Sequence, residues 1–477
     1  MKKILLYLSL GVLILSGISS CDMETKPFTL IPTEDAFTNV SDIENGLHGV
    51  YRSLAYNNFL GRNATALGDM CSDVSVADPS TGHFIAMHTW AITEAEGILL
   101  DIWTGGYTTI DRAVRGINGA KDLIASGFYL NNSDEAIVNG AIAQMYALKA
   151  LSTFVLTNIY GLPYKAGTAN DQMGVVLVKD APIELFAVTT RATVAECYAA
   201  ILADIQSAHE YMNKLSVSQK GSIDEFYMNE AAIYALEARV KLYMQDYAGA
   251  KAAANSAITG KGASPVNNDT YMSMWKSIAI TGEDIFTLAK SESDNLSANS
   301  LNTLYNSYGG KCSDFAIAKF AATDIRKDFF TANRRPLKFA GIGSAEAVNN
   351  VPVFRVSEMY LIIAEAEAAS ATGTVADAQT ALLYTAKRNS AITSVSDLPN
   401  TKAALLTFIA DERIRELFQE GHRFQDLRRT GAAATINNKP NFVLANFAYP
   451  IPAQELNATG GVDRSQQNPN WMDNLPN

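Results

Sequence analysis

Residues 411–431 read D-E-R-I-R-E-L-F-Q-E-G-H-R-F-Q-D-L-R-R-T-G. Charged side chains dominate this stretch, yet apolar side chains recur in it at i, i+3 and i+4, namely at Ile414, Leu417 and Phe418. This spacing predicts an amphipathic α-helix. Gly421 follows as a helix stop, because glycine readily adopts the left-handed conformation that ends many helices.

The charges of the same stretch alternate in sign at spacings that allow ion pairs along one helix. The expected pairs are Asp411 with Arg415, Glu412 with Arg415, and Arg413 with Glu416. Taken alone, this pattern is typical of a solvated helix with salt bridges on its surface. It favours a role in the scaffold for Glu412, Arg413 and Glu416 over a catalytic one.

Most of the remaining chain follows a helical period and divides into helix pairs. The clearest pair spans 229–258, where the pattern A-L-x-A-R-x-x-L-x-x-x-D-Y-x-x-A resembles a tetratricopeptide repeat. Three further pairs are expected at 357–389, at 134–158 with 193–212, and at 41–56 with about 108–125. Helix pairs bury their faces by stacking. The fold class predicted is therefore all-α, a tetratricopeptide-like scaffold of about four pairs.

Three stretches interrupt the helical period: 57–107, 261–350 and 431–477. They are rich in Gly, Asn, Ser and Thr. Long irregular loops on a rigid scaffold are where ligand contacts concentrate. We therefore expect these loops to bind the ligand.

The amino terminus has the features of a targeting segment. Lys2 and Lys3 precede a short apolar run, and Ile18-Ser19-Ser20-Cys21 resembles a bacterial lipobox. This predicts a signal peptide over 1–21, cleavage before Cys21 and acylation of that cysteine, where two or three chains give stable anchoring. The alternative is an ordinary secretory signal with a chance cysteine.

The composition excludes several classes of function. The formal net charge is −11, and no basic tract points to nucleic acid. The other three cysteines are far apart, so neither a disulfide framework nor a zinc site is expected, and Cys197 is expected in the core. No signature of a hydrolase, a phosphate loop or a dinucleotide site is present. We expect no enzymatic activity, no cofactor and no metal.

The order of residues in 412–431, E-R-x-x-E-L-x-x-E-G-x-R-F-x-D-L-R-R-x-G, resembles the C-terminal hallmark of the SusD/RagB family of outer-membrane nutrient-binding lipoproteins. Further stretches resemble the same family in the same order: I-W-T-G-G-Y-T-T-I-D-R-A (102–113), T-N-I-Y-G-L-P-Y (157–164), V-F-R-V-S-E-M-Y-L-I-I-A-E-A (353–366) and Y-P-I-P-A-Q-E-L (449–456). Val114 stands where the family usually has Asn. In the 353–366 helix, we expect Arg355 and Glu358 to pair with charges such as Arg413 or Glu416.

The resemblance implies an N-terminal part at 22–215 and a C-terminal part at 216–477, packed as one α-helical body. It implies a lipid-anchored protein on the outer-membrane surface that captures an oligosaccharide and passes it to a SusC-like TonB-dependent barrel. A peptide ligand of the same kind of importer is one alternative. A tetratricopeptide-type scaffold that binds only proteins, and a surface hydrolase, are the others.

The family's ligand residues lie in variable loops, so the site is chosen from the residues themselves. Sugars are bound by aromatic faces together with amide and charged side chains. On that basis the ligand-binding candidates in the loops are Asn63, Asp73, Trp90, Trp275, Tyr305 and Tyr308. Each aromatic candidate has core packing as its alternative role. Arg62 and Asn299 belong to the polar groups of the same loops.

Overall fold

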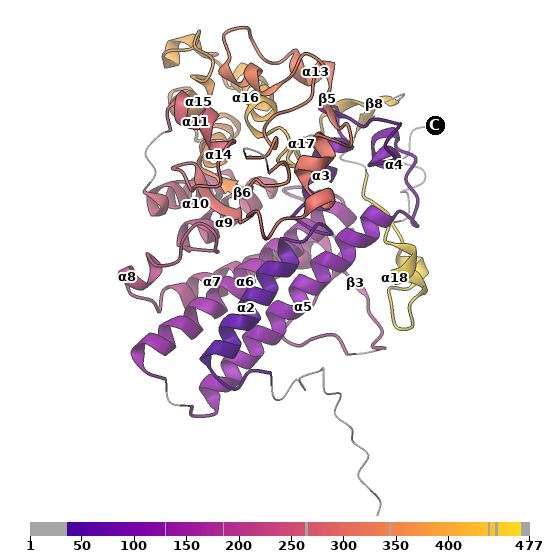
Figure 1. Ribbon diagram of the computed structural model, residues 1–477, viewed down its shortest axis with the longest axis vertical. Coiled ribbons are helices and arrows are strands. Elements are labelled where there is room, and N and C mark those ends of the chain that lie inside the picture. The colour runs from indigo at the N-terminus through magenta and orange to yellow at the C-terminus, as the bar shows by residue number, and fades with distance from the viewer. Residues whose placement is uncertain are drawn as a thin grey trace, which may run out of the picture.

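The computed structural model describes residues 36–128, 130–184, 186–262, 266–342, 345–436, 439–443 and 447–468. The protein is mostly helical, as Figure 1 shows. The predicted signal peptide and Cys21 lie outside the described residues. Within the described part of the chain, no helix has both the length and the apolar character needed to cross a membrane.

All four predicted helix pairs are confirmed, because in each pair the two helices pack against one another. The pairs are α2 (Val40–Leu54) with α5 (Gly97–Ala125), α6 (Asn132–Tyr160) with α7 (Val194–Met212), α9 (Glu230–Tyr243) with α10 (Tyr247–Lys261), and α14 (Val356–Ala369) with α15 (Val375–Ala386). Neighbouring pairs also touch, through α5 with α6, α7 with α9, and α10 with α14. This stacking gives the tetratricopeptide-like scaffold. In Figure 1 the long helices α2, α5, α6 and α7 form one layer of it.

Polar caps start these helices where the sequence turns from loop to helix. The side chains of Asn39, Asn131 and Asn229 accept hydrogen bonds from backbone N–H groups of the first turns. Thr193 and Glu196 form a reciprocal capping box at α7. Each cap satisfies donors that a helix start leaves open. Small residues then allow close packing of α9 on α10, where Ala232, Ala235, Ala250 and Ala254 are all fully buried.

The helix expected to stop at Gly421 ends earlier, at Leu417, and a second helix follows the turn. The first, α16, runs from Lys402 to Leu417, and the second, α17, from Arg423 to Thr430. Gln419 and Gly421 between them have positive φ angles of 65° and 82°. Gly421 therefore belongs to a turn that redirects the chain, rather than ending one helix by itself.

The stretches expected as irregular loops hold short elements. The helices described there are α3 (Asn63–Met70), α4 (Ile85–Thr89), α11 (Asn268–Met274), α12 (Leu301–Tyr305), α13 (Asp314–Ile317) and α18 (Ala453–Asn457), and α5 begins within the first stretch. Helix α8 (Val217–Lys220) lies elsewhere in the chain. The 3-10 helices are η2 (Ser297–Asn299), η3 (Ile325–Phe329), η4 (Val395–Asp397) and η6 (Arg464–Gln466).

The described residues form four small antiparallel sheets, two of which join segments far apart in sequence. They are β1 (Ser75–Val76) with β5 (Lys311–Cys312), β2 (Met173–Val176) with β3 (Arg191–Thr193), β4 (Asp284–Leu288) with β6 (Val351–Arg355), and β7 (Ala433–Ile436) with β8 (Lys439–Val443). One hydrophobic core cluster runs through both halves of the chain. The proposed division at 215/216 stays a prediction.

Candidate binding site

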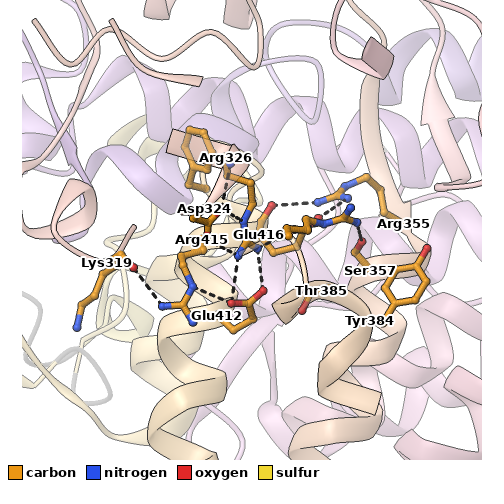
Figure 2. Close-up of polar contacts among 12 residues, drawn as sticks. Lys319, Asp324, Arg326, Arg355, Ser357, Tyr384, Thr385, Glu412, Arg415 and Glu416 are labelled. Carbon is orange, nitrogen blue, oxygen red and sulfur yellow. Dashed lines mark hydrogen bonds and ion pairs between the residues drawn. The ribbon is translucent and has the colours of Figure 1, made fainter. Parts of the chain in front are cut away.

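The charges of α16 point into the protein rather than to solvent. Glu412, Arg413 and Glu416 are at most 4% exposed. Glu416 accepts from three guanidinium groups, each at 3.0 Å: Arg326, Arg355 and Arg388 (Figure 2). Burial acts to raise the pKa of Glu416, but Arg388, Arg355 and Arg326 outweigh it and hold that pKa well below its usual range.

A second buried carboxylate, Glu283, completes this network. It pairs with Arg355 at 3.1 Å and Arg388 at 3.2 Å, and it accepts hydrogen bonds from the hydroxyls of Ser357 and Tyr384. The network therefore joins β4, β6, α14, α15 and α16 at one point. Such fully paired buried ions fix how elements fit together more than they add stability.

Two of the expected ion pairs are confirmed: Glu412 with Arg415 at 2.7 Å and Arg355 with Glu416 at 3.0 Å. The others are wrong, because α16 is buried among other elements and its charges pair across to them. Asp411 binds Lys319, Arg413 binds Asp426, and Glu358 binds Arg239.

The turn between α16 and α17, residues 418–422, holds α3 in place. The Gly421 N–H donates to Asp69 Oδ2 at 3.1 Å, and Arg423 makes two bonds of 2.7 Å to the Asp73 carboxylate. A Cβ at Gly68 would collide with the Gly421 backbone. Glycines at both positions therefore allow α3 to lie directly against the turn.

Two segments far apart in sequence meet beside α3. We call residues 57–84 the first arm and residues 297–313 the second arm. Strands β1 and β5 join them, with Ser75 opposite Cys312. The Thr81 hydroxyl also donates to the Tyr308 carbonyl at 3.0 Å. Figure 1 shows β5 close to α3 and α17 on one side of the molecule.

An aromatic stack lies where the two arms meet. The rings of His83 and Tyr308 have centroids 3.6 Å apart and are inclined by 15°, and both side chains are half-buried. Arg62 Nη1 donates to Asn299 Oδ1 at 3.4 Å, and a chain of bonds runs from Arg62 through Asn63 to Asp101. We call His83, Tyr308, Arg62, Asp101 and Asn299 the arm face.

The charges of the arm face influence one another. Burial, followed by the nearby Arg62 guanidinium, lowers the pKa of His83, so its ring is neutral at neutral pH. Burial also lowers the pKa of Arg62 and raises the pKa of Asp101, and each partly offsets the shift in the other. The arm face thus offers flat rings, a guanidinium, a carboxyl group and amides, which suit the C–H faces and hydroxyls of a sugar.

The predicted site residues divide into those near the arm face and those away from it. Tyr308 lies in it, and Asn63 lies directly behind it, fully buried. Asp73 forms the ion pair with Arg423. Tyr305 belongs to the second arm, and its side chain is buried. Trp90 packs on Phe447 at 5.0 Å, and Trp275 packs among Phe329, Phe339 and Tyr271. These three buried rings offer no open face in this structure, and direct ligand contact by them stays a prediction.

Four members of the arm face were not chosen as site residues from sequence. His83 was not proposed because its stacking partner, Tyr308, lies in the other arm and no local pattern reveals that contact. Asp101 falls in the stretch 57–107 that was expected to be irregular, but it lies on helix α5, which begins at Gly97. Arg62 stands next to the predicted Asn63, and Asn299 lies in the predicted loop, so composition was the one signal available for them.

The described residues contain no group of three or more His, Cys, Asp or Glu side chains placed to hold a metal ion. Cys71, Cys197 and Cys312 are free and buried. The core position expected for Cys197 is therefore confirmed.

Two family models match this chain. One, described as "SusD family", matches residues 318–471, and the other, described as "Starch-binding associating with outer membrane", matches residues 24–242. A curated relative, SusD-like protein P2 of Formosa agariphila, is 25% identical over 204 residues, which span 42% of this chain and 37% of that relative.

Solved structures match over most of the chain. A SusD superfamily protein from Bacteroides vulgatus is 24% identical with a TM-score of 0.79, covering 91% of this chain and 100% of that one. A putative sugar binding protein from the same species is 25% identical with a TM-score of 0.79, covering 91% and 99%. A structure described as a laminarin binding SusD-like protein is 21% identical with a TM-score of 0.70, covering 91% and 100%.

Proposed function

Because this chain belongs to the SusD/RagB family, we propose that it is a cell-surface binding protein that captures a glycan without altering it. The arm face is the proposed site. The glycan ring packs on a free face of the His83–Tyr308 stack, while Arg62, Asp101 and Asn299 bind its hydroxyls. The capture of an oligosaccharide follows the sequence-based expectation.

The observation that carries this proposal is the stack of His83 on Tyr308 with Arg62 beside it. The pairing of β1 with β5 fixes the stack, and the clamp at Gly421 and Arg423 holds α3, on which the first arm is built. A preformed face loses little conformational entropy when it binds a ligand. Two half-buried rings with charged groups next to them suit sugar binding better than they suit catalysis.

We further propose that the protein is anchored through acyl chains on Cys21 and passes its ligand to a SusC-like TonB-dependent outer-membrane barrel. Anchoring would confine the protein to the plane of that barrel and raise the effective concentration of one for the other. The family model described as associating with the outer membrane supports this location. Isolation of the protein from membranes with no barrel bound to it would contradict the partnership.

A glycan and peptide array tests the class of ligand. A soluble form that starts at Asp22 is expected to bind glycans, and incubation of each bound glycan is expected to yield no products. Tyr308→Ala should weaken binding by about fivefold or more, since one stacked ring contributes about 1–3 kcal/mol when a ligand packs on it. Tyr211→Ala is the matched control, because Tyr211 also belongs to a stacked pair but lies on α7.

If only peptides bind on the array, the alternative of a peptide-binding component of the same kind of importer is favoured. No small ligand at all would favour the protein-interaction scaffold. Glycan binding that Tyr308→Ala leaves unchanged would remove the arm face from the proposal.

A further inference from the structure

Asp69 stands at the junction of α3, the turn 418–422 and the second arm. It lies on α3, six residues after Asn63, and it is fully buried. Its Oδ2 accepts from the Gly421 N–H. Through α3 it is connected to Arg62 and Asn63, and through β1 to the second arm.

Buried polar atoms without partners collect around Asp69. Within the described part of the chain, its Oδ1, the Tyr305 hydroxyl and Arg413 Nη1 have no hydrogen-bond partner. Asp69 and Arg413 line one cavity of about 10 Å³, close to the smallest space that holds a water molecule. Leaving buried polar atoms without hydrogen bonds costs free energy, so this junction accommodates a charged carboxylate at Asp69 poorly.

The charged and titratable groups around Asp69 come from several elements, and on α4 His88, whose pKa burial lowers, hydrogen-bonds to the backbone of Met70 next to Asp69. Arg413 comes from α16, and Glu420 and His422 come from the turn 418–422. Arg423 and Asp426 come from α17. Lys338 comes from the segment before β6, and Tyr305 and Cys312 come from the second arm. Burial raises the pKa of Asp69 to about 7, against the Gly421 and Arg423 N–H groups and the Lys338 ammonium, which lower it.

Few of these neighbours change charge between pH 5 and pH 7. Burial lowers the pKa of His422 well below its usual value, and burial raises the pKa of Tyr305 and of Cys312. The pKa of Glu420 and that of Asp426 are lowered by their cationic partners, in spite of burial. Lys338, whose pKa burial lowers to about 8, begins to lose its proton only above this window.

We propose that Asp69 is a proton-controlled latch for the first arm: its neutral carboxyl group keeps α3 closed on the turn 418–422, and its ionisation favours opening. An open arm exposes the carboxylate to water, where its pKa returns to an ordinary value near 4. The closed state therefore binds the proton more tightly than the open state. By linkage, the opening equilibrium rises by up to tenfold per pH unit between about pH 5 and 7 and levels off above.

Amide hydrogen exchange of residues 57–76 at pH 5 to 7.5 tests the latch without any ligand. After the intrinsic pH dependence of exchange is divided out, the opening constant of these amides should rise with pH in the native protein. In Asp69→Asn it should be independent of pH. The proposal would be overturned if the opening constant of the native protein did not change with pH, or if it changed equally in Asp69→Asn.

Asp204→Asn is the matched control. Asp204 is also a buried carboxylate whose pKa burial raises, to about 6, but it pairs with Lys149 between α6 and α7. This variant should keep the native pH dependence in the first arm. If Asp69→Asn does not fold, carbon-13 titration of the aspartate carboxyls in the native protein decides instead, because an Asp69 that titrates below pH 5 contradicts the latch.

The consequence for ligands rests on the proposed function, since the first arm carries Arg62 and His83. A glycan identified on the array should bind several-fold more tightly at pH 6 than at pH 7.5, and Asp69→Asn should remove this difference. If amide exchange in the first arm depends on pH as predicted but glycan affinity does not, the latch is supported and the arm face is not the glycan site.

Discussion

At the scale of single residues, Glu416 is the side chain on which the family-like motif depends. Its carboxylate, fully buried, is balanced by three guanidinium groups from separate elements. Arg388 also packs over the Tyr271 ring at 3.6 Å, which makes up for some of its lost hydration. A group surrounded in this way keeps its charge only while all partners stay in place.

Glu416→Gln is expected to lower the free energy of unfolding by about 3–5 kcal/mol, because it leaves buried positive charge without its counter-ion. Urea unfolding measures this loss. Arg115→Ala serves as control, since Arg115 and Asp111 are both about 40% exposed and such pairs contribute about 1 kcal/mol or less. Equal effects of the two substitutions would show that the network is not acting as described.

The same network predicts acid sensitivity. The native pKa of Glu416 lies below its unfolded value, so the unfolded chain binds more protons in acid. The resulting stability is present above about pH 5 and is lost as pH falls further. Melting temperatures between pH 3 and 7 should fall more steeply in the native protein than in Glu416→Gln, and parallel curves would contradict this.

At this scale the sequence was informative about chemistry but not about partners. It predicted the Arg355–Glu416 pair from charge and a family resemblance, while the pairs of Asp411 and Arg413 were misassigned to their own helix. Local spacing describes an isolated helix, whereas α16 packs into the core and its long side chains reach other elements. Burial at Trp90, Trp275 and Tyr305 could not be read from composition for the same reason.

At the scale of elements, the turn 418–422 links the scaffold to the first arm. Gly421 has a φ of 82°, and a Cβ there would lie 2.6 Å from the Thr65 carbonyl. Gly431, which ends α17, has a φ of 68° and open space around it. A substitution at Gly431 therefore measures only the free-energy cost of a left-handed backbone. A substitution at Gly421 adds the cost of the contact between its Cβ and α3.

Gly431→Ala is expected to lower the free energy of unfolding by about 1 kcal/mol, the usual penalty for a left-handed alanine. Gly421→Ala should lose about 2 kcal/mol more, because α3 must shift away from the turn. Chemical unfolding compares the two variants. If both lose the same amount, α3 does not depend on contact with Gly421.

The helix pairs were predictable because their apolar period and small residues are local signals. The strands β1 and β5 were not, because each is two residues long and its partner is more than two hundred positions away. That pairing brings the residues of the arm face together. The sequence therefore predicted both loops but not the contact between them.

At the scale of the whole molecule, the stacked pairs form the scaffold, and the two arms place the arm face on it, with Arg62 buried and both rings half-buried. The Cys21 anchor would tether that body to a membrane. Cys21→Ser is expected to move the protein from the membrane fraction to the soluble fraction and to abolish labelling by radioactive fatty acid, since the acyl chains supply the binding. Retention of the variant on membranes would contradict a lipid anchor.

The central claim is that the two arms together hold a glycan at His83 and Tyr308. A crystal structure of the protein with a glycan identified on the array tests it most directly. The account predicts electron density for a sugar ring packed on a free face of the His83–Tyr308 stack, within hydrogen-bond distance of Arg62 or Asp101. Density elsewhere, for example in the groove between Tyr107 and Phe186, with the arm face empty, would contradict it.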